Sequence, residues 1–480
     1  MQQLSGLDAL FVHAERANSY MHIGPVMIYD PGTAEGGAVA YRDIVATFAD
    51  RLHLSSIFRR KLVEVPFNLD RPYWIEDPDF KLDHHIHHHT LAAPGGLQQL
   101  CDKIADLHAR PLNRNHPLWE AHVIDGLDRL EGLPRGCFAI YLKTHHATQD
   151  GATGVAIVEA IHDLQPGTVS AADDDWRAEA VPGNFKLLRR ALVNSLRQPA
   201  MLVRVGGRVV PALRHLRAAS NSAESPDLLL PEKTRFNGPI SARRVVGCIT
   251  VELGQLKRIS KLVPGATIND VSLAIVSGAM RKYLQSKGEL PQDTLVAGAP
   301  VNARRSAQQD TGGNVVSVMR VSLCTQLEEP LERLRGIHRS SKNAKKSQGA
   351  IGADLMTDLV ASLPGYLLAW GSAAALATGV MGKMNPVMHT LVTNVPGPRA
   401  PLYLCNARMR MIVGLGPCLD GIGLFHTISS YCDVVAVGFQ ACSEMLPDPA
   451  LYTQCLQQSF DELRAARLPR KKTQRGRNSS

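Results

Sequence analysis

Two adjacent histidines, followed by an aspartate and a glycine, are the residues whose types and spacing best suit chemistry in this sequence. They form His145-His146-Ala147-Thr148-Gln149-Asp150-Gly151. An imidazole takes up and returns protons near neutral pH, so a histidine here could act as a general base. Asp150 could orient the imidazole of His146, or it could turn away and brace the loop. The spacing does not decide between these roles, and a turn with two incidental histidines is the alternative.

The segments on either side predict where this motif lies. Residues 137–144 are apolar or β-favouring at most positions and predict a strand. Residues 152–161 are small and apolar, as in a helix. The motif therefore lies where a strand gives way to a helix, a place where side chains are exposed while the scaffold holds them rigid.

The rest of the chain predicts mixed sheets and helices in two similar halves, an α/β fold class. We expect an N-terminal domain over 1–179, a basic crossover linker over 180–235, a second domain over 236–468 and a basic disordered tail over 469–480. In the second half, Thr267-Ile268-Asn269-Asp270 is expected to cap a long apolar helix, since Asn or Asp commonly caps the first turn.

The crossover contains no acidic residue from Ala180 to Ala223. Its eight basic residues alternate with apolar ones at roughly helical spacing over 186–217. Such a segment can lie in a membrane interface, or it can pack on the protein with its charges in water. Nucleic acid is a weaker interpretation, because no aromatic interleaving accompanies the charge. Residues 359–382 carry no charge, but their Pro-Gly and small residues favour buried or interfacial helices over a membrane span.

The bulk composition fits a globular chain of 480 residues with a net charge of +9. Nine scattered cysteines without a CxxC pair predict reduced thiols and a cytoplasmic location, and no signal peptide is expected. A dense histidine cluster over 84–89 could suggest zinc, but alternate residues of an extended segment face opposite sides. No second ligand set has metal spacing, so we expect no metal site.

Several further motifs, in order, resemble the bacterial wax ester synthase / acyl-CoA:diacylglycerol acyltransferase family, particularly the actinobacterial triacylglycerol synthase type. Besides the histidine motif, the matching stretches are Leu4-Ser5-Gly6-Leu7-Asp8-Ala9-Leu10-Phe11, Met21-His22-Ile23-Gly24, Pro117-Leu118-Trp119, Asn269-Asp270, Pro300-Val301-Asn302-Ala303-Arg304, Gly313-Asn314-Val315-Val316-Ser317 and Asn394-Val395-Pro396-Gly397-Pro398. Gln149 is a departure, since the family more often has an apolar residue there.

The resemblance implies two chloramphenicol-acetyltransferase-like domains with a tunnel between them. It implies acyl transfer from acyl-CoA, a substrate rather than a cofactor, to diacylglycerol or a long-chain alcohol. His146 would be the general base and His145 its assistant. Asp150, followed by Gly151, would be structural and would pair with Arg304 across the domain interface.

The resemblance also implies supporting roles for other residues. Asn269, beside Asp270, would assist the oxyanion or hold the helix start, because a tetrahedral oxyanion needs donors. Pro117, Leu118 and Trp119 would form scaffold and tunnel wall. A histidine base leaves no need for a serine or cysteine nucleophile, so direct transfer without an acyl-enzyme is expected.

Two other functions stay open. A condensation-type or polyketide-ester acyltransferase would share HHxxxDG but would take its acyl group from a carrier protein. A non-catalytic relative would bind lipid bodies through the basic segment. Both for the acyl-CoA-dependent acyltransferase and for the lipid-body-binding relative, we expect a cytoplasmic protein that associates peripherally with the inner membrane or with lipid inclusions. We expect no nucleic acid partner.

Overall fold

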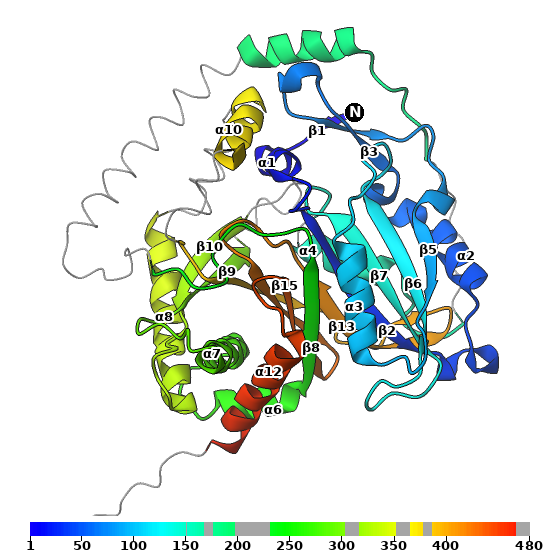
Figure 1. Cartoon of the computed structure of the whole chain (residues 1–480). Coiled ribbons are helices and arrows are strands. Elements are labelled where there is room, and N and C mark those ends of the chain that lie inside the picture. The colour runs from blue at the N-terminus through cyan, green and yellow to red at the C-terminus, as the bar shows by residue number, and fades with distance from the viewer. Residues whose placement is uncertain are drawn as a thin grey trace, which may run out of the picture.

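The computed structural model describes residues 1–149, 151–167, 176–196, 231–302, 316–351, 365–377 and 386–466. Within them, two six-stranded sheets form two halves that pack side by side (Figure 1). A small third sheet consists of β1 (Gln2–Gln3), β4 (Tyr73–Glu76) and β3 (Arg60–Val63). This confirms the α/β prediction of mixed sheets in two halves.

The first large sheet carries the histidine motif at the end of a central strand. In spatial order its strands are β12 (Tyr403–Leu404), β13 (Ala407–Leu415), β2 (His22–Asp30), β7 (Cys137–His145), β6 (Trp119–Leu127) and β5 (Ile86–Thr90). Every residue of β7 is buried, which explains its continuous apolar run. The strands β12 and β13 come from the second half of the sequence and complete the first sheet.

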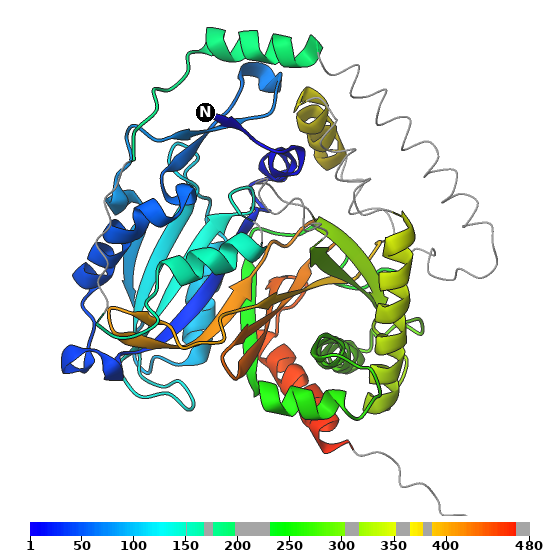
Figure 2. The same ribbon diagram turned by 180° about the vertical axis from the view of Figure 1, so that it is seen from behind.

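The helices of the first half lie around this sheet, with α1 packed beside α10 (Gly365–Ala377). They are α1 (Gly6–Ala14), α2 (Tyr41–Arg51), α3 (Leu97–His108) and α4 (Gly151–Ala160). Ser5 caps α1 because its side chain accepts a hydrogen bond from the Asp8 backbone. Figure 2 shows α4 where the two halves meet.

The second large sheet surrounds a buried helix. Its strands, in spatial order, are β10 (Val316–Ser322), β9 (Val296–Asn302), β11 (Thr390–Pro396), β14 (Leu424–Tyr431), β15 (Val434–Cys442) and β8 (Arg244–Glu252). The helices of this half are α6 (Leu253–Ser260), α7 (Ile268–Ser286), α8 (Pro330–Ile351), α10 (Gly365–Ala377) and α12 (Pro449–Ala465). Most of α7 is buried, as its apolar sequence predicts.

The two halves share a hydrophobic core. One cluster combines Ile104 and Tyr141 of the first half with Val246, Cys248 and Ala436 of the second. Arg16 also forms an ion pair with Asp420, with 2.5 Å between Nη2 and Oδ2. These contacts join the two halves into one packed body.

The described parts of the crossover and of the uncharged stretch each contain a helix. Residues 184–196 form a helix, and α10 occupies the described part of 359–382. In the described part of the chain no helix is both long and apolar enough to cross a bilayer. The rest of the basic segment, 197–217, lies outside the described residues, as does the tail from 469.

Gly24 brings β2 very close to β7. A Cβ atom there would lie 2.0 Å from the carbonyl oxygen of Leu142, far inside van der Waals contact. We therefore expect Gly24→Ala to lower the free energy of unfolding by about 3 kcal/mol, because the backbone of a central strand must move. Urea unfolding measures this change. Gly254→Ala in α6 is the control, since nothing lies within 4 Å of its added Cβ. Equal stability of the two variants would contradict the close approach.

Candidate active site

The histidine turn begins at the buried end of β7 and is fixed by its own backbone. The N–H of His145 donates to the carbonyl of Leu118 at 3.0 Å, and His145 pairs with His22 of β2. The carbonyl of His145 then accepts hydrogen bonds from the backbone N–H of Thr148, at 2.9 Å, and from its hydroxyl, at 2.7 Å. The motif is therefore a tight turn between a strand and a helix, as predicted.

His146 is half-buried and is held on two sides. Its backbone N–H donates to the carbonyl of Met21 at 2.7 Å. Its ring stacks on Phe11, with 4.3 Å between ring centroids and 25° between the planes. An aromatic neighbour restricts the rotation of an imidazole without consuming a ring nitrogen. His146 thus has a fixed ring in the place expected of a general base.

His145 is fully buried, and both of its ring nitrogens face neighbouring groups. Nδ1 accepts a hydrogen bond from the backbone N–H of Ala147 at 3.0 Å, and Nε2 lies 3.2 Å from Oε1 of Glu15. The side chain therefore braces the turn. Its predicted assisting role in catalysis stays a prediction.

Glu15 is a member of the site that the sequence analysis missed. Its carboxylate contacts His145, accepts the backbone N–H of Met21 at 3.0 Å and pairs with Arg114 at 2.8 Å. Burial alone would raise the pKa of Glu15, but its contacts with His145 and Arg114 outweigh burial and lower it to about 2. Its position between α1 and the Met21-His22 motif was the available signal.

Gln149 is buried in the turn, although the family more often has an apolar residue there. Its side-chain amide donates to the hydroxyl of Thr144 at 2.6 Å, and its tip packs near Gly154 of α4. The hydroxyl thus meets part of the hydrogen-bonding demand of this polar side chain. Asp150 and Arg304 lie outside the described residues, so their predicted ion pair stays a prediction, as does the role of Gly151 at the start of α4.

Asn269 and Asp270 play different parts at the start of α7. Thr267 is the N-cap, and Asp270 completes a capping box by accepting from the backbone N–H and the hydroxyl of Thr267. Asp270 also faces Nδ1 of His338 in α8 at 3.0 Å. Asn269 is half-buried, and its side-chain oxygen accepts from Asn394 of β11 at 3.3 Å. Two motifs that are far apart in sequence thus meet through this bond.

The Pro117-Leu118-Trp119 motif supports the turn from the neighbouring strand. Leu118 packs with Ala147 in a small hydrophobic cluster. Trp119 is 1% exposed, and its indole N–H donates to the carbonyl of Phe58 at 2.9 Å. These contacts are those of a scaffold, whereas the tunnel-wall role predicted for the three residues stays a prediction.

The histidine cluster over 84–89 is spread over an edge of the first sheet. His85 is buried and stacks on Trp119, while His88 pairs with Asp125 and His89 contacts His122. Across the part of the chain that the structure describes, no three potential metal-ligating residues gather around one point.

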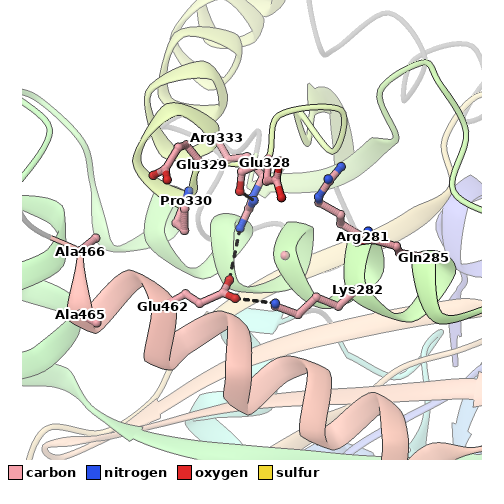
Figure 3. Close-up of a pocket in the computed structure, with 11 residues that line it drawn as sticks. Arg281, Lys282, Gln285, Glu328, Glu329, Pro330, Arg333, Glu462, Ala465 and Ala466 are labelled. Atoms are coloured by element: carbon pink, nitrogen blue, oxygen red, sulfur yellow. Dashed lines mark hydrogen bonds and ion pairs between the residues drawn. The ribbon is translucent and has the colours of Figure 1, made fainter.

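A separate pocket of about 470 Å³ lies in the second half, between α7, α8 and α12 (Figure 3). Its lining contains both basic and acidic side chains. Lys282 pairs with Glu462, Arg281 donates to the carbonyl of Thr325, and the buried Arg333 donates to the carbonyl of Leu327. Gly278 leaves room for this packing, since a Cβ there would lie 2.1 Å from the hydroxyl of Ser459. The pocket is charge-balanced and contains no residue of the histidine motif.

The fold of this chain is shared with acyltransferases of known structure. The structure resembles the wax ester synthase/diacylglycerol acyltransferase of Marinobacter aquaeolei VT8, with a TM-score of 0.67 and 24% identity over 96% of this chain and 98% of that one. It also resembles the TRI3 trichothecene 15-O-acetyltransferase of Fusarium sporotrichioides, with a TM-score of 0.58, 11% identity and coverage of 96% and 94%. Likeness at these identities shows the shared fold.

The sequence comparisons identify the family. The model of the wax ester synthase/diacylglycerol acyltransferase catalytic domain matches residues 4–272, and that of the family's C-terminal domain matches 312–464. A Mycobacterium tuberculosis protein provisionally named as a diacylglycerol O-acyltransferase is 31% identical over 93% of this chain and 87% of its own length. The chain belongs to the wax ester synthase/diacylglycerol acyltransferase family, which confirms the predicted resemblance and its enzyme class.

Proposed function

We propose that this enzyme transfers an acyl group from acyl-CoA to the hydroxyl of diacylglycerol, and of long-chain alcohols, with His146 as the general base. The observation that carries the proposal is the fixed, half-buried ring of His146 on a turn of the family's catalytic domain. A neutral imidazole there removes the hydroxyl proton while the oxygen attacks the thioester carbonyl. The resulting imidazolium then returns the proton to the departing CoA thiolate.

The remaining parts of the site support this step. The tetrahedral intermediate carries an oxyanion that needs a donor, and Asn269 is our candidate for it. The bond of Asn269 to Asn394 uses its side-chain oxygen, which leaves the amide N–H groups to point elsewhere. Asp150 and Arg304 would brace the loop across the two halves.

The donor and the acceptor together test this function. We expect purified enzyme to form triacylglycerol from palmitoyl-CoA and diacylglycerol, and to form little from palmitoyl-carrier protein. A preference for the carrier protein would instead support the condensation-type alternative. That alternative has in its favour a fold likeness to a rhizomide synthetase condensation domain, at a TM-score of 0.54 and 14% identity.

We further propose that one end of the molecule binds a lipid surface. The helix over 184–196 lies there, with α10 nearby in both views (Figures 1 and 2). The helix packs through Leu187 and Ala191 on Val65 and Tyr73, while its other face is exposed. The most exposed apolar side chains at this end are Phe67 (76%), Phe185 (82%), Leu192 (63%), Leu196 (75%) and Trp370 (58%).

The charge of this helix supports a lipid surface with anionic headgroups. Lys186, Arg189 and Arg190 are exposed beside the apolar face, and the helix carries no acidic residue. Arg189 and Arg190 also line a pocket of about 480 Å³ against the N-terminal residues. Basic residues beside exposed apolar and aromatic ones suit an interface with anionic headgroups.

Substitution of the apolar face tests this surface. We expect the triple variant Phe185→Ser, Leu192→Ser, Leu196→Ser to bind vesicles of phosphatidylcholine and phosphatidylglycerol at least tenfold more weakly in co-sedimentation, since each apolar side chain adds about 1.5–3 kcal/mol on burial. The double variant Leu54→Ser, Leu164→Ser removes two exposed leucines outside this helix and is the control. Unchanged vesicle binding by the triple variant would overturn the assignment.

A further inference from the structure

Glu15 lies behind the histidine turn, at the end of α1, and its carboxylate is almost enclosed. Its side chain is 10% exposed. Within 3.2 Å the carboxylate meets Nε2 of His145, the backbone N–H of Met21 and the guanidinium of Arg114. A buried carboxylate is costly unless such donors compensate for its lost hydration. These three groups therefore compensate the buried negative charge of Glu15.

Two contacts of Glu15 are made to residues that directly hold the backbone of His146. The N–H of Met21 donates to Glu15, and the carbonyl of Met21 accepts from the N–H of His146 at 2.7 Å. The other contact, His145, directly precedes His146 in the chain. The helix that ends at Glu15 also supplies Phe11, whose ring stacks on His146. One short segment thus fixes the proposed base through its backbone and through its ring.

The charge of Glu15 also selects the tautomer of His145. A carboxylate facing Nε2 favours a proton on that nitrogen, which leaves the lone pair of Nδ1 to accept from the N–H of Ala147. The other nearby imidazole is that of His22, with Nε2 at 3.9 Å. Burial lowers the pKa of His22 to about 3, so this ring is neutral. Arg114 is the cation that balances the carboxylate, and it extends outward to Glu64 at 2.9 Å.

We propose that Glu15 is a positioning residue for acyl transfer: its carboxylate holds the His145 ring and the Met21 peptide, and thereby places His146 against the acceptor hydroxyl. This role rests on the proposed function with His146 as the base. Glu15 itself touches no reacting atom. Its removal should therefore slow turnover while substrate binding is retained.

The variant Glu15→Gln keeps the size of the side chain and removes its charge. We expect kcat to fall about 10- to 100-fold, the range seen when carboxylates that orient metal-bound histidines are replaced. We expect KM for palmitoyl-CoA to stay within twofold of the wild type. Glu64→Gln is the matched control, because it removes the other carboxylate from Arg114 at a half-exposed site. Glu64→Gln should keep kcat within twofold of the wild-type value.

A spectroscopic readout separates positioning from general stability. With ¹⁵N-labelled histidine, long-range ¹H–¹⁵N spectra of the wild type should show His145 protonated at Nε2 alone, and Glu15→Gln should raise the Nδ1–H form. A wild-type His145 protonated at Nδ1 would overturn the proposal even if Glu15→Gln does not fold. A folded Glu15→Gln enzyme with wild-type kcat would also overturn it. Absence of acyl transfer by the wild type would instead refute the proposed function, while the tautomer still reports on Glu15.

Discussion

His146→Ala is expected to reduce CoA release from palmitoyl-CoA in the presence of diacylglycerol by about a thousandfold. A positioned general base contributes roughly 10²- to 10⁴-fold, and an alcohol is a poor nucleophile while it keeps its proton. The ring of His146 stacks on Phe11, and its backbone N–H donates to the carbonyl of Met21, so the imidazole that the variant removes is one held in a defined position. Steady-state CoA release, measured with a thiol reagent, gives the ratio of the two rates.

His88→Ala is the matched control for this loss. His88 lies on the edge strand β5, is about 41% exposed and pairs with Asp125. The same histidine-to-alanine change there should leave the rate within twofold of the wild type. If His146→Ala kept full activity while circular dichroism showed a native fold, His146 would not be the base.

Trp119→Ala is expected to lower the free energy of unfolding by about 3–5 kcal/mol, the range for large buried aromatic residues. The indole stacks on His85 at 4.5 Å between centroids and meets Phe58 edge-to-face at 5.0 Å. Its removal leaves a cavity and an unpaired carbonyl at Phe58. Trp119 directly follows Leu118, whose carbonyl accepts the backbone N–H of His145. We therefore also expect the variant to lose its activity on heating at a lower temperature than the wild type. Chemical unfolding followed by circular dichroism measures the stability change.

Trp176→Ala is the comparison for Trp119→Ala. Trp176 is only half-buried, and its indole N–H donates to Glu76. We expect Trp176→Ala to lower the free energy of unfolding by about 1 kcal/mol, the contribution of an ordinary hydrogen bond. A similar loss for both variants would show that Trp119 is not the core residue described above.

The strands and helices around the site could be predicted because their signals are local. The apolar run before His145 gave β7, and the small residues after Gly151 gave α4. The long apolar helix was also predicted, with Thr267-Ile268-Asn269-Asp270 as the stretch that caps its start. The structure shows Thr267 as the N-cap, because its hydroxyl accepts the backbone N–H of Asp270.

The parts that the sequence did not predict depend on contacts between distant residues. β13 pairs with β2, although Met409 and Tyr29, which face each other there, are far apart in the chain. Glu15 and Phe11 meet the histidine turn through the same kind of long-range packing. The spacing of apolar residues within one helix or strand does not predict which distant segment will pack against it. The family motif contained Phe11 but gave no reason to expect its ring on His146.

The basic segment over 186–217, which the sequence left open between membrane contact and packing on the protein, combines local and long-range signals. Its helical spacing correctly indicated the helix over 184–196. The exposure of Phe185 and Leu196, and the presence of α10, the helix that contains Trp370, at the same end of the molecule, depend on the fold. The sequence could therefore suggest an amphipathic basic helix, but it could not show which separate segments form the proposed lipid-binding surface.

The claim that the acyl group passes from CoA to the acceptor without an acyl-enzyme is tested by a single-turnover experiment. Enzyme in excess over palmitoyl-CoA is mixed with or without diacylglycerol, and free CoA and triacylglycerol are quantified over time. We predict that CoA and triacylglycerol appear together in equal amounts, and that neither forms without diacylglycerol. A burst of CoA without the acceptor, accompanied by palmitoylated protein in the mass spectrum, would contradict direct transfer.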